Sequence, residues 1–200
     1  MDKYLEKMRE IKDFTMATTD RKGRPDTRII DIMLANDEGV FFLTARGKNF
    51  YRQLSRQKYV SMTGLSKNWE MVSLRGRVKQ VGQEYLEPIF SENPSMHEMY
   101  PGKSREILEV FCLYEGQGEF FDLSKVPIFR ETFFIGAPEE EKKGYYILEQ
   151  ACTECGACSQ SCPQDCIKEE PYCIIESRCL HCGLCAEVCP ANAVERYGEE

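Results

Sequence analysis

Two stretches decide the fold of the C-terminal part of the chain: ACTECGACSQSCP at 151–163 and RCLHCGLCAEVCP at 178–190. Each stretch has the spacing C-x2-C-x2-C-x3-C-P. The cysteines are Cys152, Cys155, Cys158 and Cys162 in the first run, and Cys179, Cys182, Cys185 and Cys189 in the second. Two runs of this kind supply the thiolates for two cubane [4Fe-4S] clusters, and the fourth Cys of each run ligates the other cluster.

The predicted ligand sets are therefore crossed between the runs. One cluster takes Cys152, Cys155, Cys158 and Cys189, and the second takes Cys179, Cys182, Cys185 and Cys162. A compact loop with a Cys every third residue can wrap three corners of a cube, and the fourth Cys starts a short helix that leads away from it. Pro163 and Pro190 fit the first turn of such a helix, because proline has no N–H to leave unpaired there.

Two other uses of these cysteines compete with iron–sulfur ligation. A closed zinc site takes four ligands and usually shows two C-x2-C pairs, which is not the pattern of these runs. A disulfide framework is typical of small secreted domains, and the first residues do not read as a signal peptide. The spacing favours the clusters over both.

The similarity of the two runs extends beyond the cysteines. A shift of 27 residues (179 − 152) lays Tyr145 on Tyr172, Ile147 on Ile174, Leu148 on Ile175 and Glu149 on Glu176. Such a repeat predicts two halves related by approximate two-fold symmetry. Residues 144–198 resemble a bacterial-type two-cluster ferredoxin, in which each half is a short strand, a cluster loop and a short helix. Cys166 and Cys173 lie outside the ligand spacing and are predicted to be small buried residues.

Length and composition limit the kinds of domain and partner that the rest of the chain can have. Its 200 residues leave about 140 for a further domain with its own core. The net charge of −7 argues against a nucleic-acid partner, because phosphate binding needs a basic surface. No window approaches the 18 apolar residues of a membrane span. Eleven Cys without an export signal indicate a reducing cytoplasm, and exposed clusters suggest an anaerobe.

The first 57 residues predict helices at both ends and strands between. A helix is expected over 1–13, where Tyr4, Met8 and Ile11 form one apolar stripe. Strands are expected over 14–19, 27–34 and 40–45, separated by turns and forming a meander. A short helix is expected over 47–57.

The following segment predicts further strands. They are expected over 59–64, 70–81, 108–124 and 128–135, with a helical and loop stretch over 82–100. Six or seven short strands with few helices indicate a small antiparallel barrel or sandwich. The expected organisation is a domain at 1–136, a polar linker at 137–143 and the ferredoxin-like domain at 144–200.

The order of these elements resembles the FMN-binding split barrel of the pyridoxamine 5′-phosphate oxidase-like superfamily, and so do several short sequence segments within them. The resemblance covers roughly residues 5–135. It is carried by FTMATTDRKGRPDTRIID at 14–31 and VFFLTARGKNFYRQL at 40–54, with EMVSLRGRVKQV and ENPSM following. The expected fold is a mainly β split barrel joined to a small α+β two-cluster ferredoxin domain.

The resemblance implies an FMN site. Its phosphate is expected near Lys48 at the start of a helix, since helix N-termini favour anions. The strand that bears Arg28 is expected to line the flavin. The residues that the resemblance assigns to the flavin are Arg28, Ile29, Ile30, Thr44, Arg46, Lys48 and Asn49. In this family the flavin lies at a dimer interface, so Trp69 or Arg75 is expected to approach it from the other subunit.

Two [4Fe-4S] clusters and FMN in one chain predict an oxidoreductase that relays electrons between them. A redox protein or a small-molecule donor or acceptor is the expected partner, and a homodimer the expected assembly; nucleic acid and membrane are not expected. No nucleophile triad and no G-x-G-x-x-G motif is evident, and no catalytic residue is assigned. The alternative is an electron carrier without its own substrate, or a redox or flavin-sensing partner subunit of a larger complex. Pyridoxamine 5′-phosphate oxidase activity is a weaker alternative. His97 is expected to be structural or exposed, His181 only to neighbour a cluster, and Cys112 to be a buried, inert thiol.

Overall fold

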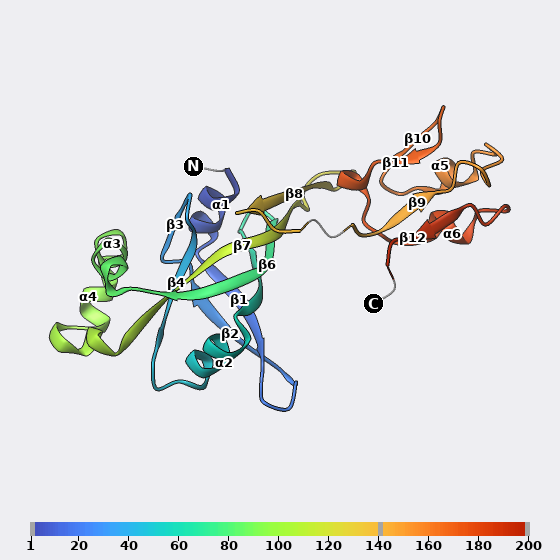
Figure 1. The fold of residues 1–200 in the computed structure, drawn as a ribbon. Helices are drawn as coiled ribbons and strands as arrows, with labels where there is room; N and C mark the ends of the chain where they lie inside the picture. The colour runs from blue at the N-terminus through green and yellow to red at the C-terminus, as the bar shows by residue number, and fades with distance from the viewer. Residues whose placement is uncertain (1–2, 140–141, 199–200) are drawn as a thin grey trace. The chain divides into compact units, whose positions relative to one another are not determined.

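The computed structural model describes residues 3–139 and 142–198 and divides into two compact units (Figure 1). The first unit comprises Met1–Phe120 and Thr132–Pro138, and the second comprises Phe121–Glu131 and Glu139–Glu200. The predicted linker at 137–143 includes residues 140–141, which lie outside the described residues. No helix in the described ranges is both long and apolar enough to span a membrane.

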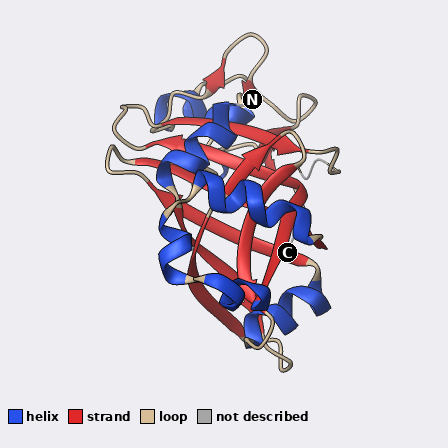
Figure 2. Cartoon of the chain, turned by 90° about the vertical axis from the view of Figure 1, so that its left-hand side faces the viewer, coloured by secondary structure: helices blue, strands red, loops and turns tan. Residues whose placement is uncertain are grey.

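Strands predominate and the helices are short (Figure 2). The elements up to residue 135 are α1 (Lys3–Ile11), β1 (Asp13–Thr19), β2 (Pro25–Asp31), β3 (Leu34–Asn36), β4 (Gly39–Ala45), α2 (Asn49–Gln57), β5 (Tyr59–Leu65), β6 (Glu70–Val81), η1 (Gln83–Tyr85), α3 (Leu86–Glu92), α4 (Ser95–Met99), η2 (Gly102–Ile107), β7 (Leu108–Asp122) and β8 (Phe129–Ile135). Those after it are β9 (Tyr145–Ile147), α5 (Ala157–Ser161), β10 (Ile167–Lys168), β11 (Cys173–Ile174), η3 (Glu176–Arg178), α6 (Leu184–Glu187) and β12 (Val194–Arg196).

One antiparallel sheet forms the body of the first unit, in the order β2-β1-β5-β6-β7-β4-β3, with β8 paired to β7. Strands β2 and β4 also contact each other, although they lie far apart in this order. The sheet therefore curls toward closure, as in a barrel. Its alternation is clear in β6, where Val72, Leu74, Gly76 and Val78 are buried and the residues between them are not.

The predicted meander is wrong. The run at 27–34 breaks at Met33. The N–H of Ile32 still donates to Lys12, the next pair of the β1–β2 register, but the N–H of Met33 donates to Phe41 instead. The chain then enters the short strand β3, which pairs with β4. Strand β2 consequently ends the sheet beside β1, and β4 lies between β3 and β7. Ile32 and Met33 are both buried, so burial of apolar side chains favours this crossing.

Two apolar cores fill the first unit. One lies between the sheet and helices α1 and α2 and includes Met8, Phe14, Phe42 and Leu54. The other packs α3 and α4 against β3, β4 and β7. The predicted stripe on the first helix is confirmed, because Tyr4 and Met8 are buried and Ile11 packs against the same core.

The second unit repeats one small motif in two halves. Strand β9 pairs with β12, and β10 pairs with β11, so each half supplies a strand to the other. The registers match the repeat: Ile147 pairs with Val194, and Ile174 pairs with Ile167. Helices α5 and α6 pack together, α5 also contacts β10, and α6 also contacts β12. This is the α+β arrangement that the repeat predicts.

Candidate functional site

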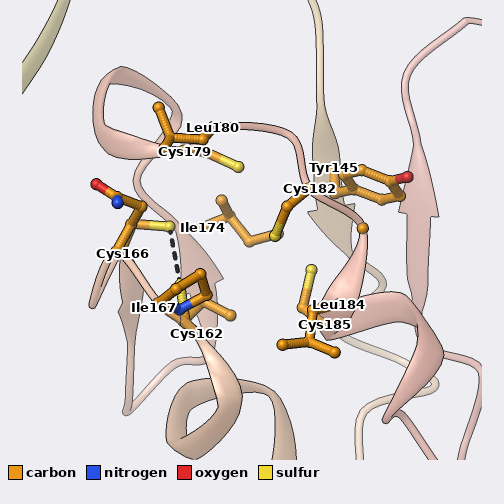
Figure 3. A pocket seen from close by; sticks show the side chains of 13 residues that line it. Tyr145, Cys162, Cys166, Ile167, Ile174, Cys179, Leu180, Cys182, Leu184 and Cys185 are labelled. Carbon is orange, nitrogen blue, oxygen red and sulfur yellow. Dashed lines mark hydrogen bonds between the residues drawn. The ribbon is translucent and has the colours of Figure 1, made fainter. Parts of the chain in front are cut away.

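Five cysteines line one small cavity of the second unit. They are Cys162, Cys166, Cys179, Cys182 and Cys185. Figure 3 shows the sulfur atoms of Cys179, Cys182 and Cys185 turned toward the same space, with Cys162 and Cys166 at its side. Much of the remaining lining is apolar, with Ile167 and Leu184 among it. Cys189, the last cysteine of the second run, does not line this cavity, whereas Cys162 of the first run does.

The backbone of each cysteine loop curls tightly enough to turn its thiols inward. Gly156 and Gly183 have φ of 75° and 84°, and Glu154 and His181 also have positive φ, at 54° and 57°. Left-handed residues at these equivalent positions wrap the loop around its own centre. Helices α5 and α6 begin directly after the two glycines.

Burial sets the protonation of several of these thiols. Desolvation raises the pKa of Cys158, and it raises the pKa of Cys185 to about 11. The pKa of Cys179 is lowered to about 6, first by a hydrogen bond from Cys166 and also by the backbone N–H of His181. The pKa of Cys166 is raised, chiefly by that same bond. Metal ligation requires thiolates, so cluster binding at Cys185 releases a proton.

The structure separates the two cysteines outside the ligand spacing. Cys166 is buried, as predicted, and its Sγ lies 3.4 Å from that of Cys162. Cys173 is exposed, so the prediction of a buried residue is wrong there. In the β10–β11 ladder Cys173 pairs with the exposed Lys168, while Ile174 pairs with Ile167 on the other face.

The cysteines of the other predicted cluster site are Cys152, Cys155, Cys158 and Cys189, and fewer contacts between them are seen. Cys152 and Cys155 lie close enough to Cys158 to act on its pKa. Cys189 follows α6, which packs against α5, and its Sγ accepts a bond from the N–H of Ala193 at 3.2 Å. His181 is half-buried and lies between the ligands of its run, while the exposed His97 makes a T-shaped ring contact with Phe90.

A second group of predicted residues gathers at the start of α2. Arg46, Gly47, Lys48 and Asn49 are all exposed, and Lys48 precedes the helix with no side chain capping its first turn. The first N–H groups of a helix attract anions when no cap is present. The neighbouring Thr44 is buried, and its hydroxyl has no hydrogen-bond partner. These features fit a phosphate-bearing ligand.

Arg28 is half-buried and is held by residues of β1, β2 and α2. Its guanidinium donates to Thr18 Oγ1 at 2.7 Å and Gln53 Oε1 at 3.1 Å, and pairs with Asp26 at 2.9 Å. It also lies over the ring of Phe50. The flavin contact predicted for Arg28 remains a prediction, and the geometry gives this residue the further role of tying β2 to α2.

The neighbours of Arg28 on its strand differ in exposure. Ile30 is buried, whereas Ile29 is 71% exposed. Among the described strands β2 pairs only with β1, so its other edge leaves backbone groups open to a ligand. Trp69 lies in the turn between β5 and β6 and is 62% exposed, and Arg75 is half-buried on β6.

Comparison with protein-family models gives two matches. The model described as pyridoxamine 5′-phosphate oxidase matches residues 1–110, more than half of the chain. This chain belongs to the pyridoxamine 5′-phosphate oxidase family. A second model, the 4Fe-4S binding domain, matches residues 145–168 and 172–195. No curated protein matches significantly.

Solved structures agree with the family on the fold. A NimC/NimA family protein from Clostridium acetobutylicum is 22% identical, with a TM-score of 0.58, over 66% of this chain and 90% of that one. A heme binding protein from Mycobacterium smegmatis is 14% identical, with a TM-score of 0.51, over 66% of this chain and 58% of that one. The first unit thus has the split-barrel fold of the pyridoxamine 5′-phosphate oxidase family.

Within this family, the chain joins a flavin-type barrel to a 4Fe-4S binding domain, a combination that indicates redox chemistry. The cysteines that line the cavity fit a 4Fe-4S cluster, because their thiols are spread around a space and not gathered at one point. In the described residues, no three His, Cys, Asp or Glu side chains are grouped as around one metal ion. A cubane has an iron at each of four corners and needs its thiolates spread around it.

Sequence reasoning missed two polar residues. Gln53 is buried and bonds to Thr18, Arg28 and Asp26; its signal is an amide on the same helical face as Phe50 and Leu54. Arg130 is also buried, and its guanidinium bonds the carbonyl of Cys179. It lies 49 residues before that cysteine, and no motif points to it.

Proposed function

We propose that this chain is a flavin and iron–sulfur oxidoreductase that relays electrons between two [4Fe-4S] clusters and an FMN bound by the barrel. One observation carries the proposal: Cys162 of the first run shares a cavity with three cysteines of the second. That grouping supports the crossed ligand sets of a two-cluster ferredoxin. By symmetry Cys189 completes the set of Cys152, Cys155 and Cys158.

The flavin part of the proposal rests on the start of α2. Lys48 and Arg46 would hold the phosphate together with the first N–H groups of the helix, and Thr44 would give its unpaired hydroxyl. The open edge of β2 at Ile29 would lie along the ring. A flavin exchanges one or two electrons, whereas a cubane passes one at a time, so the pair couples one-electron to two-electron chemistry.

A homodimer is part of the same proposal. Ile29, Leu65 and Trp69 are apolar, and each is more than half exposed on the first unit. A second copy that covered them would remove this apolar area from water. Light scattering of the purified protein measures the assembly directly, and a monomer at micromolar concentration would reject this part.

Cofactor content tests the relay. Anaerobically purified protein should hold about eight irons and about eight sulfides per chain, four of each for each cluster, and about one FMN released by heat. Four irons would reject the second cluster. Eight irons without flavin would reject the FMN site. Heme in place of flavin would show that the barrel binds the ligand named for the mycobacterial neighbour.

Lys48→Ala tests where the phosphate binds. Loss of a charged hydrogen bond should weaken FMN binding roughly tenfold. Lys125→Ala is the matched control, because Lys125 is an exposed lysine in the turn between β7 and β8. Equal affinities for both variants would contradict the assignment of Lys48.

The alternative is a carrier that exchanges electrons only with another protein. An enzyme should be oxidised or reduced by a small molecule at a rate that saturates with its concentration. A carrier should exchange quickly with a partner protein and negligibly with small molecules. Oxidation of pyridoxamine 5′-phosphate by oxygen is a weaker alternative, because it does not require clusters, and its assay is the release of the aldehyde product.

A further inference from the structure

Arg130 reaches the second cysteine loop from outside the ferredoxin repeat. It lies in the segment Phe121–Glu131, which belongs to the second unit, and only 7% of it is exposed. One guanidinium nitrogen, Nη1, lies 2.5 Å from the carbonyl oxygen of Cys179 and 3.0 Å from that of Glu176. The same nitrogen lies 3.1 Å from Nε2 of His181. A full positive charge is thus buried against the loop of Cys179.

The other loop has a different group at the equivalent place. The shift of 27 residues that lays Cys152 on Cys179 also lays Glu154 on His181. Glu154 is exposed and carries a negative charge, whereas His181 is half-buried beside Arg130. The two loops share their cysteine spacing, yet the charges beside them have opposite signs.

We propose that Arg130 raises the reduction potential of the cluster held by Cys162, Cys179, Cys182 and Cys185 above that of the other cluster. The inference rests on the proposed function, since it needs both clusters. Reduction adds one electron and therefore one negative charge, which a nearby cation stabilises. A guanidinium keeps its charge at every accessible pH, and burial strengthens its field. Net charge and hydrogen bonding around a cluster are known determinants of its potential.

Other charges near this loop act more weakly. Arg178 precedes Cys179 but is exposed, so water and salt screen it. Glu176 opposes Arg130, but it is exposed, so water and salt screen its carboxylate as well. The buried guanidinium therefore sets the sign of the field. The cluster held by Cys162, Cys179, Cys182 and Cys185 is consequently reduced first, and the other cluster passes electrons toward it.

Redox titration of the loaded full chain, followed by electron paramagnetic resonance, tests the proposal. Arg130→Gln keeps a hydrogen-bond donor and removes the charge. It should lower the higher of the two midpoints enough to change the ratio of reduced to oxidised cluster at least tenfold, which is 59 mV for one electron. Arg178→Gln, the matched control, loses the same charge from an exposed site and should shift this midpoint less. Arg130→Lys should restore it.

Two variants identify the clusters without altering Arg130. Cys155→Ser keeps only the second cluster and Cys182→Ser only the first, and the surviving midpoint should be higher in Cys155→Ser. A lower midpoint in Cys155→Ser than in Cys182→Ser would overturn the proposal, even if the Arg130→Gln variant failed to take up its clusters. An unchanged midpoint in Arg130→Gln, or an equal shift of both, would also overturn it. Absence of iron from the wild-type chain would instead reject the proposed function.

Discussion

The two cysteine loops of the second unit have nearly the same backbone and different surroundings. Gly156 and Gly183 turn the chain in the same sense, as do Glu154 and His181. The second loop is packed against a buried arginine, whereas the first presents an exposed carboxylate. A sequence repeat therefore reproduces the geometry of a site, while residues outside the repeat make the two sites unequal.

The largest expected effect comes from removing ligands in pairs. Cys182→Ser should abolish the second cluster and about half of the bound iron. Adding Cys162→Ser should remove no more, because both cysteines line one cavity. Adding Cys155→Ser should remove the rest. Iron per chain and visible absorbance measure the loss, and nearly complete loss in the Cys162 and Cys182 double variant would break the crossed assignment.

A smaller effect is expected from the two glycines. An alanine at either position would adopt a left-handed conformation that costs about 1–2 kcal/mol. At Gly183 its Cβ would also lie 2.8 Å from the hydroxyl of Tyr145, whereas at Gly156 its nearest neighbour is the flexible Gln160 amide at 3.3 Å. Gly183→Ala should therefore destabilise its site by about 1 kcal/mol more.

The rate at which a chelator removes iron measures this difference, with wild-type protein as the reference. Gly183→Ala should lose one cluster first, and Gly156→Ala should lose iron more slowly. The same rate in both variants would show that Tyr145 moves aside without cost and that the two loops are equally tolerant.

The smallest expected effect is that of Glu154→Gln. Removing this exposed charge should raise the midpoint of the first cluster, by less than Arg130→Gln lowers the other. Its effect should fade in 1 M salt, where charges are screened beyond about 3 Å, while the effect of the buried Arg130 should persist. Equal salt dependence of the two shifts would show that burial does not distinguish the sites.

The sequence predicted the parts of this molecule that depend on local spacing. The cysteine runs, the repeat and the alternation in β6 all follow from residues close together in the chain. The break between β2 and β3 was not predicted, because it depends on the bond from Met33 to Phe41, which lies on another strand of the fold. A continuous apolar run does not mark such a crossing.

The residues of the candidate site likewise include some that local sequence predicts and one that only the fold can place. Lys48 and its neighbours follow from the order of a strand, a turn and a helix, and the structure exposes them together. Arg130 could not be predicted, because an Arg in the run IFRETFFI reads as the outward residue of a strand. Only the packing of Phe121–Glu131 within the second unit places its guanidinium at Cys179.

The exchanged strands have a consequence for how the second unit comes together. Strand β9 finds its partner in β12, and β10 finds its partner in β11, so neither half satisfies its own backbone. A peptide of one half would therefore fold only by associating with another copy. Joining the halves through the short segment 169–172 turns that encounter into an intramolecular one, which makes folding independent of protein concentration.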